Sequence, residues 1–184
     1  MPAAYCSSSL FPVSPRRYGP TGVSPTAAAG PDAATVILPG VQFMFDIDAS
    51  PGARATVLAD CISKAGSDTA KMQACPAAVS KAGASEGIRF EKEGDQWIYV
   101  SFGAKEGGEE IFLRAPIAKL DSAAHEFKFK PSGPATGSQV SPENAGKFDQ
   151  AKADAMVMTV EVIDATTVAM NAPPPKGRLV YHKK

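Results

Sequence analysis

The sequence lacks most of the features by which enzymes and metalloproteins are recognised. It has only two histidines and three cysteines, with no Cys-x-x-Cys pair from which a zinc site could be built. Neither a phosphate-binding P-loop nor a Gly-x-Gly-x-x-Gly dinucleotide-binding string occurs. We therefore expect a non-enzymatic protein that has no cofactor and no metal site.

An excess of charge of either sign is also missing. Lys plus Arg and Asp plus Glu both number 19, which gives a formal net charge of zero. Proteins that bind nucleic acids usually carry a basic patch or stripe, so we expect no nucleic-acid partner. The chain also has no run of about 18 apolar residues, the length that a membrane-spanning helix needs, and we expect no transmembrane segment.

Prolines are concentrated near the N-terminus. Seven of them precede Gly40, interleaved with Ala, Ser and Gly: Pro2, Pro12, Pro15, Pro20, Pro25, Pro31 and Pro39. A stretch of this composition buries too little apolar surface to offset the entropy lost on ordering. We therefore predict an extended Pro/Ala/Ser-rich arm over residues 1–40 and one folded domain over residues 41–184.

A strand and then two helices are predicted at the start of the folded domain. Apolar side chains in residues 41–47 recur with the period of two that marks a half-buried strand. Ser50-Pro51 is typical of a helix start, with proline at the first helical position, and Gly66 is a C-terminal signal. A second helix begins after Asp68, and we expect Pro76 to break it, because an interior proline costs about 3 kcal/mol.

Strand-like segments then follow one another with no long helix between them. They cover residues 87–92, 95–103, 109–115, 125–130, 155–164, 166–172 and 177–183. Strands on short connections pair antiparallel, because parallel pairs need a crossover of about a dozen residues or more. The interval 131–154 is long for a bare loop, so a short helix is expected over residues 144–153, anchored by Phe148.

The predicted fold class is therefore mainly β. We expect an antiparallel up-and-down meander that forms a small barrel or a strongly curved sheet. A helical hairpin is inserted after the first strand, and the extended arm precedes the whole domain.

Cys61 and Cys75 are candidates for a disulfide. They lie on the apolar faces of the two predicted helices, and a turn at Gly66-Ser67 would bring these faces together. The alternative is a pair of buried free thiols. A disulfide implies an oxidising compartment, so we expect a periplasmic or extracellular protein. Cys6 is interpreted as an exposed thiol of the arm.

Four aromatic residues are candidates for the wall of a ligand cavity: Phe90, Trp97, Tyr99 and Phe127. A barrel of about eight strands is just wide enough to be filled by its own side chains or to hold one small ligand. The same aromatic residues can therefore form an ordinary packed core, and this alternative stays open.

The strand over residues 95–103 is apolar on both faces. Trp97 and Tyr99 share one face, while Ile98, Val100 and Phe102 share the other. We expect one face to line the barrel interior and the other to be covered by the helical hairpin or by a partner.

The order of these elements resembles a small bacterial lipocalin-like barrel protein. The resemblance covers residues 41–184: a strand, a helical insert, a meander, and a last strand containing Arg178-Leu179-Val180-Tyr181. Gly94-Asp95-Gln96-Trp97 is similar to the Gly-x-Trp motif of lipocalins but stands in a later strand. The resemblance implies a barrel that can carry a small apolar molecule.

Two functions are consistent with these features. The first is a structural or accessory subunit of a larger protein assembly, which docks through the arm. Its partner-binding candidates are Tyr5, Phe11, Arg16, Arg17 and Tyr18. The alternative is a binding protein that holds a small apolar ligand in the barrel. The sequence favours the first, because the arm fills a fifth of the chain and has no use in a simple carrier.

Overall fold

A computed structural model describes residues 30–105 and 107–184 of the chain. The five partner-binding candidates of the arm and Cys6 lie outside these residues. The hypothesis that the arm docks on an assembly is therefore carried forward as a proposal.

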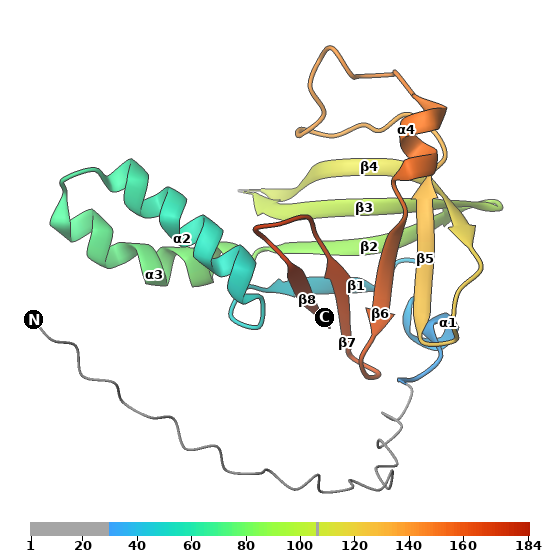
Figure 1. Ribbon diagram of the computed structural model, residues 1–184, viewed down its shortest axis with the longest axis horizontal. Coiled ribbons are helices and arrows are strands. Elements are labelled where there is room, and N and C mark those ends of the chain that lie inside the picture. Colours follow the sequence, from blue (N-terminus) through green and yellow to red (C-terminus); the bar gives the residue numbers. More distant parts are fainter. Residues whose placement is uncertain (1–29, 106) are drawn as a thin grey trace, which may run out of the picture.

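The described chain forms a closed eight-stranded barrel (Figure 1). Each strand pairs antiparallel with the next, and the first strand also pairs with the last. The mainly β meander is thus confirmed, in its barrel form. The strands are β1 (Gln42–Asp46), β2 (Glu86–Glu93), β3 (Gln96–Lys105), β4 (Gly108–Leu120), β5 (Glu126–Pro131), β6 (Met158–Val162), β7 (Thr167–Asn171) and β8 (Arg178–Lys183).

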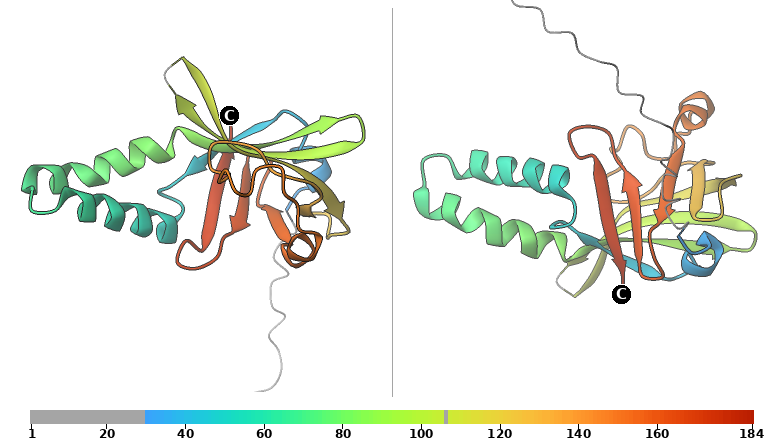
Figure 2. Two further views of the ribbon diagram at one scale, coloured as in Figure 1. Left: turned by 90° about the horizontal axis from the view of Figure 1, so that it is seen from above. Right: turned by 60° about the horizontal axis from the view of Figure 1, so that its bottom comes forward.

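The helical insert lies between β1 and β2 and projects away from the barrel (Figure 2). It consists of α2 (Pro51–Ala65) and α3 (Thr69–Gly83). A disulfide joins Cys61 to Cys75, with the two Cα atoms 5.9 Å apart, and this confirms the predicted pairing. Few residues of the hairpin are buried, so the covalent link replaces much of the packing that helices usually need.

The start of α2 is tied to the barrel by a buried serine. Ser50 is the N-cap residue and Pro51 opens the helix, as predicted. The Ser50 hydroxyl does not cap the helix, however. It donates to the carbonyl of Asp46 at 2.7 Å and accepts from the backbone N–H of Val180 at 2.9 Å. This residue therefore holds the base of the hairpin against β8.

The prediction of a break at Pro76 is wrong, since α3 continues through this residue to Gly83. Pro76 is exposed. Water can therefore hydrate the carbonyl that loses its backbone donor. The disulfide at the preceding residue, Cys75, also ties this part of α3 to α2.

One end of the barrel interior is sealed by a short helix, α1 (Ala33–Val36). Ala33, Val36 and Ile37 are buried in the same cluster as Phe90 and Phe127. These residues lie in the range that the sequence assigned to the arm, so at least this part of the predicted arm is packed against the barrel. Because prolines flank this short apolar segment, the overall composition of residues 1–40 did not indicate that the segment would pack against the barrel.

The outer face of β3 is covered in a way that the sequence did not predict. Ile98, Val100 and Phe102 are buried there, yet the helical hairpin does not cover them. Arg89 and Arg114 lie opposite Val100 on the two neighbouring strands, and the Arg89 guanidinium lies 5.0 Å from the centre of the Phe102 ring. Their aliphatic stems shield the apolar cluster while their charged ends stay near water.

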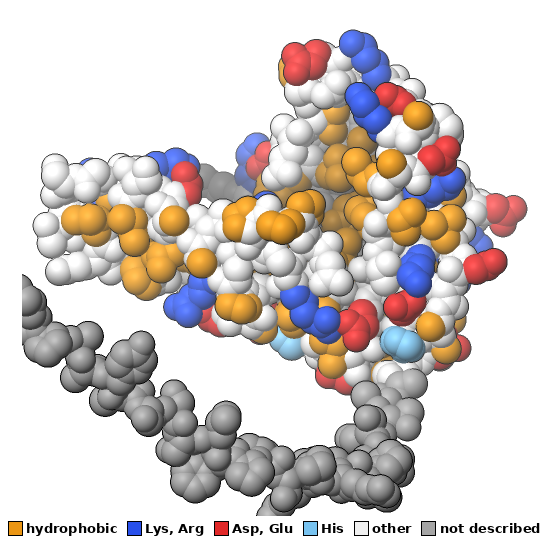
Figure 3. Space-filling view, in the orientation of Figure 1, with side chains coloured by type: hydrophobic (Ala, Val, Ile, Leu, Met, Phe, Trp, Pro, Cys, Tyr) orange, Lys and Arg blue, Asp and Glu red, His pale blue; other side chains and the backbone are white. Residues whose placement is uncertain are grey.

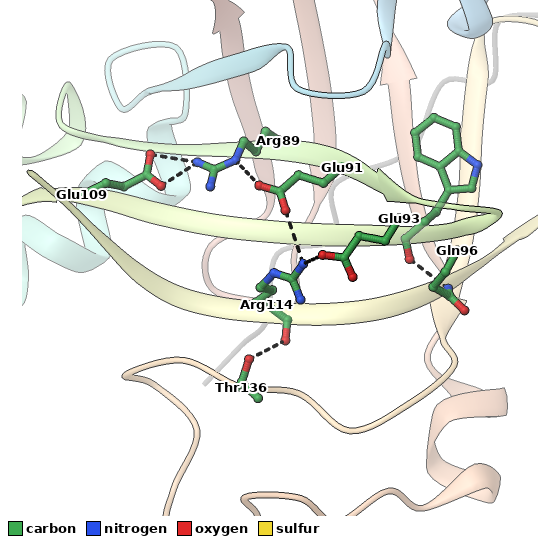
Figure 4. A network of polar contacts seen from close by, with 8 residues as sticks. Arg89, Glu91, Glu93, Gln96, Glu109, Arg114 and Thr136 are labelled. Atoms are coloured by element: carbon green, nitrogen blue, oxygen red, sulfur yellow. Dashed lines mark hydrogen bonds and ion pairs between the residues drawn. The ribbon is translucent and has the colours of Figure 1, made fainter.

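A network of ion pairs holds these arginines in place (Figure 4). Arg89 contacts Glu91 and Glu109, each at 2.7 Å, and Arg114 contacts Glu91 and Glu93. Only 14% of the Arg89 side chain is exposed, so this residue is the most buried member of the charged network that covers the apolar cluster.

The segment between β5 and β6 runs along the free edge of β4. Backbone bonds of 2.7 and 2.8 Å join Arg114 to Thr136, and the N–H of Gln139 donates to the carbonyl of Phe112. The helix in this interval, α4 (Gln150–Ala155), begins later than predicted. Phe148 is 37% exposed, so the prediction that it anchors the helix is wrong. Asp149, which caps α4, sets the helix start instead.

Candidate ligand site at the open end of the barrel

The barrel interior is divided into a packed half and a hollow half. In the packed half, the ring of Phe127 lies 4.8 Å from that of Phe90 and 5.6 Å from that of Trp97. Phe129 is fully buried and packs edge-on against Phe90. Such aromatic pairs stabilise a core beyond the area they bury. This half, which α1 closes, is filled by these packed side chains.

The hollow half contains a cavity of about 270 Å³ next to the helical hairpin. Its lining combines apolar and polar side chains from β1, α2, β2, β3, β4, β8 and two loops. The lining residues are Phe45, Ala53, Val57, Glu86, Gly87, Ile88, Tyr99, Ser101, Phe112, Gln139, Lys176, Leu179 and Tyr181.

Of the four predicted cavity residues, only Tyr99 reaches this space. Phe90, Trp97 and Phe127 belong to the packed cluster, which was the alternative that the sequence left open. The alternation of β3 put Trp97 and Tyr99 on one shared face, and the structure shows that this is the inner face. Alternation cannot tell which end of a barrel stays hollow.

The wall of the cavity is built where distant segments approach closely. A Cβ atom at Gly52 would come within 2.5 Å of the carbonyl oxygen of Lys176, so α2 and the β7–β8 loop touch through backbone atoms. Ala53 and Val57, further along α2, therefore lie over the opening. The buried Ser50 keeps this arrangement by bonding to β8.

Two tyrosines supply polar groups inside the cavity. Burial raises the pKa of Tyr99 to about 12. Burial also raises the pKa of Tyr181, with smaller contributions from Tyr99 and Glu86. Neither hydroxyl is hydrogen-bonded to another residue in the described parts of the chain. Both therefore stay neutral at physiological pH and can donate to, or accept from, a bound molecule.

One carboxylate and one ammonium group belong to the same lining. Desolvation raises the pKa of Glu86, and the positive charge of Lys176 partly opposes this shift. Among the described residues, no ion pair closer than 4.0 Å involves either side chain. By contrast, Arg89 and Glu91 on the same strand as Glu86 are both paired. The two charges at the cavity are thus available to a ligand.

Glu86 lies in a Gly-x-Ser-x-Gly string, Gly83-Ala84-Ser85-Glu86-Gly87, which has the sequence of a hydrolase nucleophile motif. In hydrolases this motif turns a strand into a helix and exposes the serine. Here the order is reversed, because α3 runs into β2. The glycines have packing roles instead: a Cβ at Gly83 would clash with Ile47, and one at Gly87 with the carbonyl of Phe43.

A second polar cluster lies on the outer surface, across the β1–β8–β7 seam. His182 Nε2 lies 3.0 Å from Asp46 Oδ2, and its Nδ1 lies 3.2 Å from the Thr167 hydroxyl. Asp46 also accepts from the N–H groups of Asp48 and Ala49, and these bonds, chiefly that of Ala49, lower its pKa. Since Thr167 is only 9% exposed, its hydroxyl is poorly placed to attack a substrate. We assign this cluster a structural role: its contacts join β8 to β1 and β7, where the barrel closes.

The described part of the chain contains no group of three or more His, Cys, Asp or Glu residues that could hold a metal ion. None of its helices is long and apolar enough to span a membrane. Comparisons with models of protein families, with curated proteins and with solved structures find no match to this chain.

Proposed function

We propose that this protein binds a small amphiphilic molecule in the hollow end of its barrel. One observation carries the proposal: the cavity combines apolar walls with two tyrosine hydroxyls and two charged groups. None of these four groups makes a hydrogen bond or an ion pair with another described residue. Binding sites for small molecules share this design, in which mostly apolar walls hold a few placed polar groups. The function thus corresponds to the carrier hypothesis of the sequence rather than to its first hypothesis.

The size of the cavity limits the ligand. Ligand sites usually range from about 300 to 1,000 Å³, and the cavity of about 270 Å³ lies just below this range. A long acyl chain or a ligand with several large fused rings exceeds this volume. A molecule with one small ring system, such as a benzene or indole group, and one or two polar groups suits the space.

A cavity-filling variant tests this function. Ser101 lines the cavity, whereas Ala104 lies on the same strand and is exposed. Ligand-observed NMR with indole, tryptamine, indole-3-propionate and tryptophan should detect binding of at least one compound to the wild type. Ser101→Phe should abolish that binding, and Ala104→Phe should retain it. If no compound of this size binds, or if both variants bind equally well, the proposed function is wrong.

A second candidate function is docking on a protein assembly, which one structural feature favours. The hairpin extends from the barrel, and Figure 3 shows apolar side chains gathered along it. Ile62 on α2 is 42% exposed. Deletion of residues 1–29 would test the contribution of the arm and leaves Gly30, which lies beside the Val162 carbonyl, in place. The truncated protein should keep its melting temperature and leave the complex with which it is purified. Retention at full occupancy would contradict docking through the arm.

The disulfide supports the proposal that the protein works in an oxidising compartment, in the periplasm or outside the cell. The closed antiparallel barrel supports the lipocalin-like part of the predicted resemblance. The compartment would be tested by the redox state of the cysteines in the native host and by the location of the protein after cell fractionation.

A further inference from the structure

We propose, on the basis of the binding function above, that the cavity selects a zwitterion: a small molecule with an ammonium and a carboxylate group beside an apolar, preferably aromatic, body. A free aromatic amino acid is the simplest member of this class. Glu86 would hold the ammonium group, Lys176 would hold the carboxylate, and the aromatic walls would enclose the body.

The lining of the cavity is balanced in charge. Glu86 is the single acidic residue and Lys176 the single basic residue among the described residues that line the cavity. Lys176 acts on the Glu86 carboxyl through its charge but makes no ion pair with it within 4.0 Å. A ligand with one group of each sign can contact both, whereas the two residues do not neutralise each other by direct contact.

The same two charged residues should discriminate against ligands that carry only one charge. Lys176 and Glu86 are near enough to interact through their charges, so a simple carboxylate bound at Lys176 would also be repelled by the negative charge of Glu86. A simple amine that reaches Glu86 would meet the same repulsion from Lys176. Only a ligand with both groups turns each repulsion into an attraction, so the lining selects against the alternatives as well as for its ligand.

Aromatic side chains form much of the cavity wall. The rings of Phe45 and Tyr181 lie 5.4 Å apart at the cavity, and Tyr99 and Phe112 complete its aromatic lining. Aromatic faces attract an ammonium group through cation–π interactions and pack well against a ring. The hydroxyls of Tyr99 and Tyr181, which lack partners among the described residues, can bond to either charged group of the ligand.

The experiment compares four ligands that share the indole ring system. Tryptophan carries both charges, tryptamine only the ammonium, indole-3-propionate only the carboxylate, and indole neither. Isothermal titration at pH 7 with the full-length wild-type chain should show tryptophan binding at least about tenfold more tightly than each of the others. A tenfold difference corresponds to about 1.4 kcal/mol, the scale of one charge-assisted contact. This comparison needs no variant and therefore does not depend on how a substitution affects folding.

Two matched variants then assign the charges. Glu86→Gln should remove the advantage of tryptophan over indole-3-propionate, and Lys176→Gln should remove its advantage over tryptamine. Glu143→Gln and Lys147→Gln, which change exposed charges outside the cavity, should leave all four affinities unchanged.

The outcomes separate this inference from the function on which it rests. If tryptamine, indole-3-propionate or indole binds as tightly as tryptophan, selection of a zwitterion is refuted and the binding function stands. If none of the four compounds binds, both proposals fall. If tryptophan binds best but neither glutamine variant changes its advantage, the assignment of Glu86 and Lys176 is wrong.

Discussion

The two ends of this barrel belong to one closed sheet but differ in what their inner side chains do. At the closed end, Phe90, Phe127 and Phe129 pack ring against ring beneath α1. At the open end, Tyr99 and Tyr181 face a hollow beside Glu86. The comparison shows that one alternating pattern can stabilise the fold at one end and leave room for a ligand at the other. Residue size and the neighbouring elements decide which occurs.

The largest effect should come from removing a ring of the closed end. Phe129→Ala deletes a fully buried side chain and should cost about 3–5 kcal/mol of unfolding free energy. Phe112→Ala, at the open end, should cost no more than about half of this, because its ring borders space that is already empty. Urea denaturation of both variants measures the difference. Equal losses would show that the two ends are equally packed.

Loss of the disulfide should affect the open end more than the closed end. Replacing Cys61 and Cys75 by alanine releases a loop of 14 residues, which the chain-entropy model values at about 3 kcal/mol. Hydrogen exchange should accelerate in α2 and α3, while amides of β5 and β6 stay protected. Because α2 lies over the cavity, ligand affinity should fall as well. Unchanged exchange in the hairpin would show that its helices are held by other contacts.

A smaller effect is expected at the seam where β1 meets β8. Asp46→Asn weakens three hydrogen-bond interactions and should cost about 1 kcal/mol at pH 7. Since the folded protein lowers the pKa of Asp46, this contribution exists above the ordinary carboxyl range, near pH 4, and disappears as the pH falls through the lowered value. Thermal melts of both proteins from pH 7 to pH 2 should therefore converge at acid pH. A constant difference would point to packing instead of charge.

The smallest effect should be a gain in stability at the open end. Burial raises the pKa of Glu86, so its charged form is less favourable in the folded chain than in the unfolded one. Glu86→Gln should therefore stabilise the protein slightly at pH 7, by less than about 1 kcal/mol, because part of the side chain is exposed and water screens its charge. The gain should vanish at pH 3, where both states hold a protonated carboxyl. A loss of stability at pH 7 would mean that Glu86 has a structural partner.

Much of the fold was predictable from local patterns. Alternating apolar residues located every strand, short connections required antiparallel pairing, and Cys61 and Cys75 were placed by helix signals at Ser50-Pro51 and Gly66. The candidate site was less predictable. Tyr99 was identified from its strand face, but Glu86 and Lys176 were not, since charged residues next to turns are usually solvated.

The sequence by itself determined the strand order, the sets of residues that share a face of a strand and the position of the disulfide, because these depend on neighbours within a few residues or on short connections. The tertiary structure decided which end of the barrel is hollow, how α1 closes the other end, and how Arg89 covers the outer face of β3. It also brought Glu86 and Lys176, 90 positions apart, to one cavity. Such juxtapositions arise only when the barrel closes, since they depend on the register of strands that are distant in the chain.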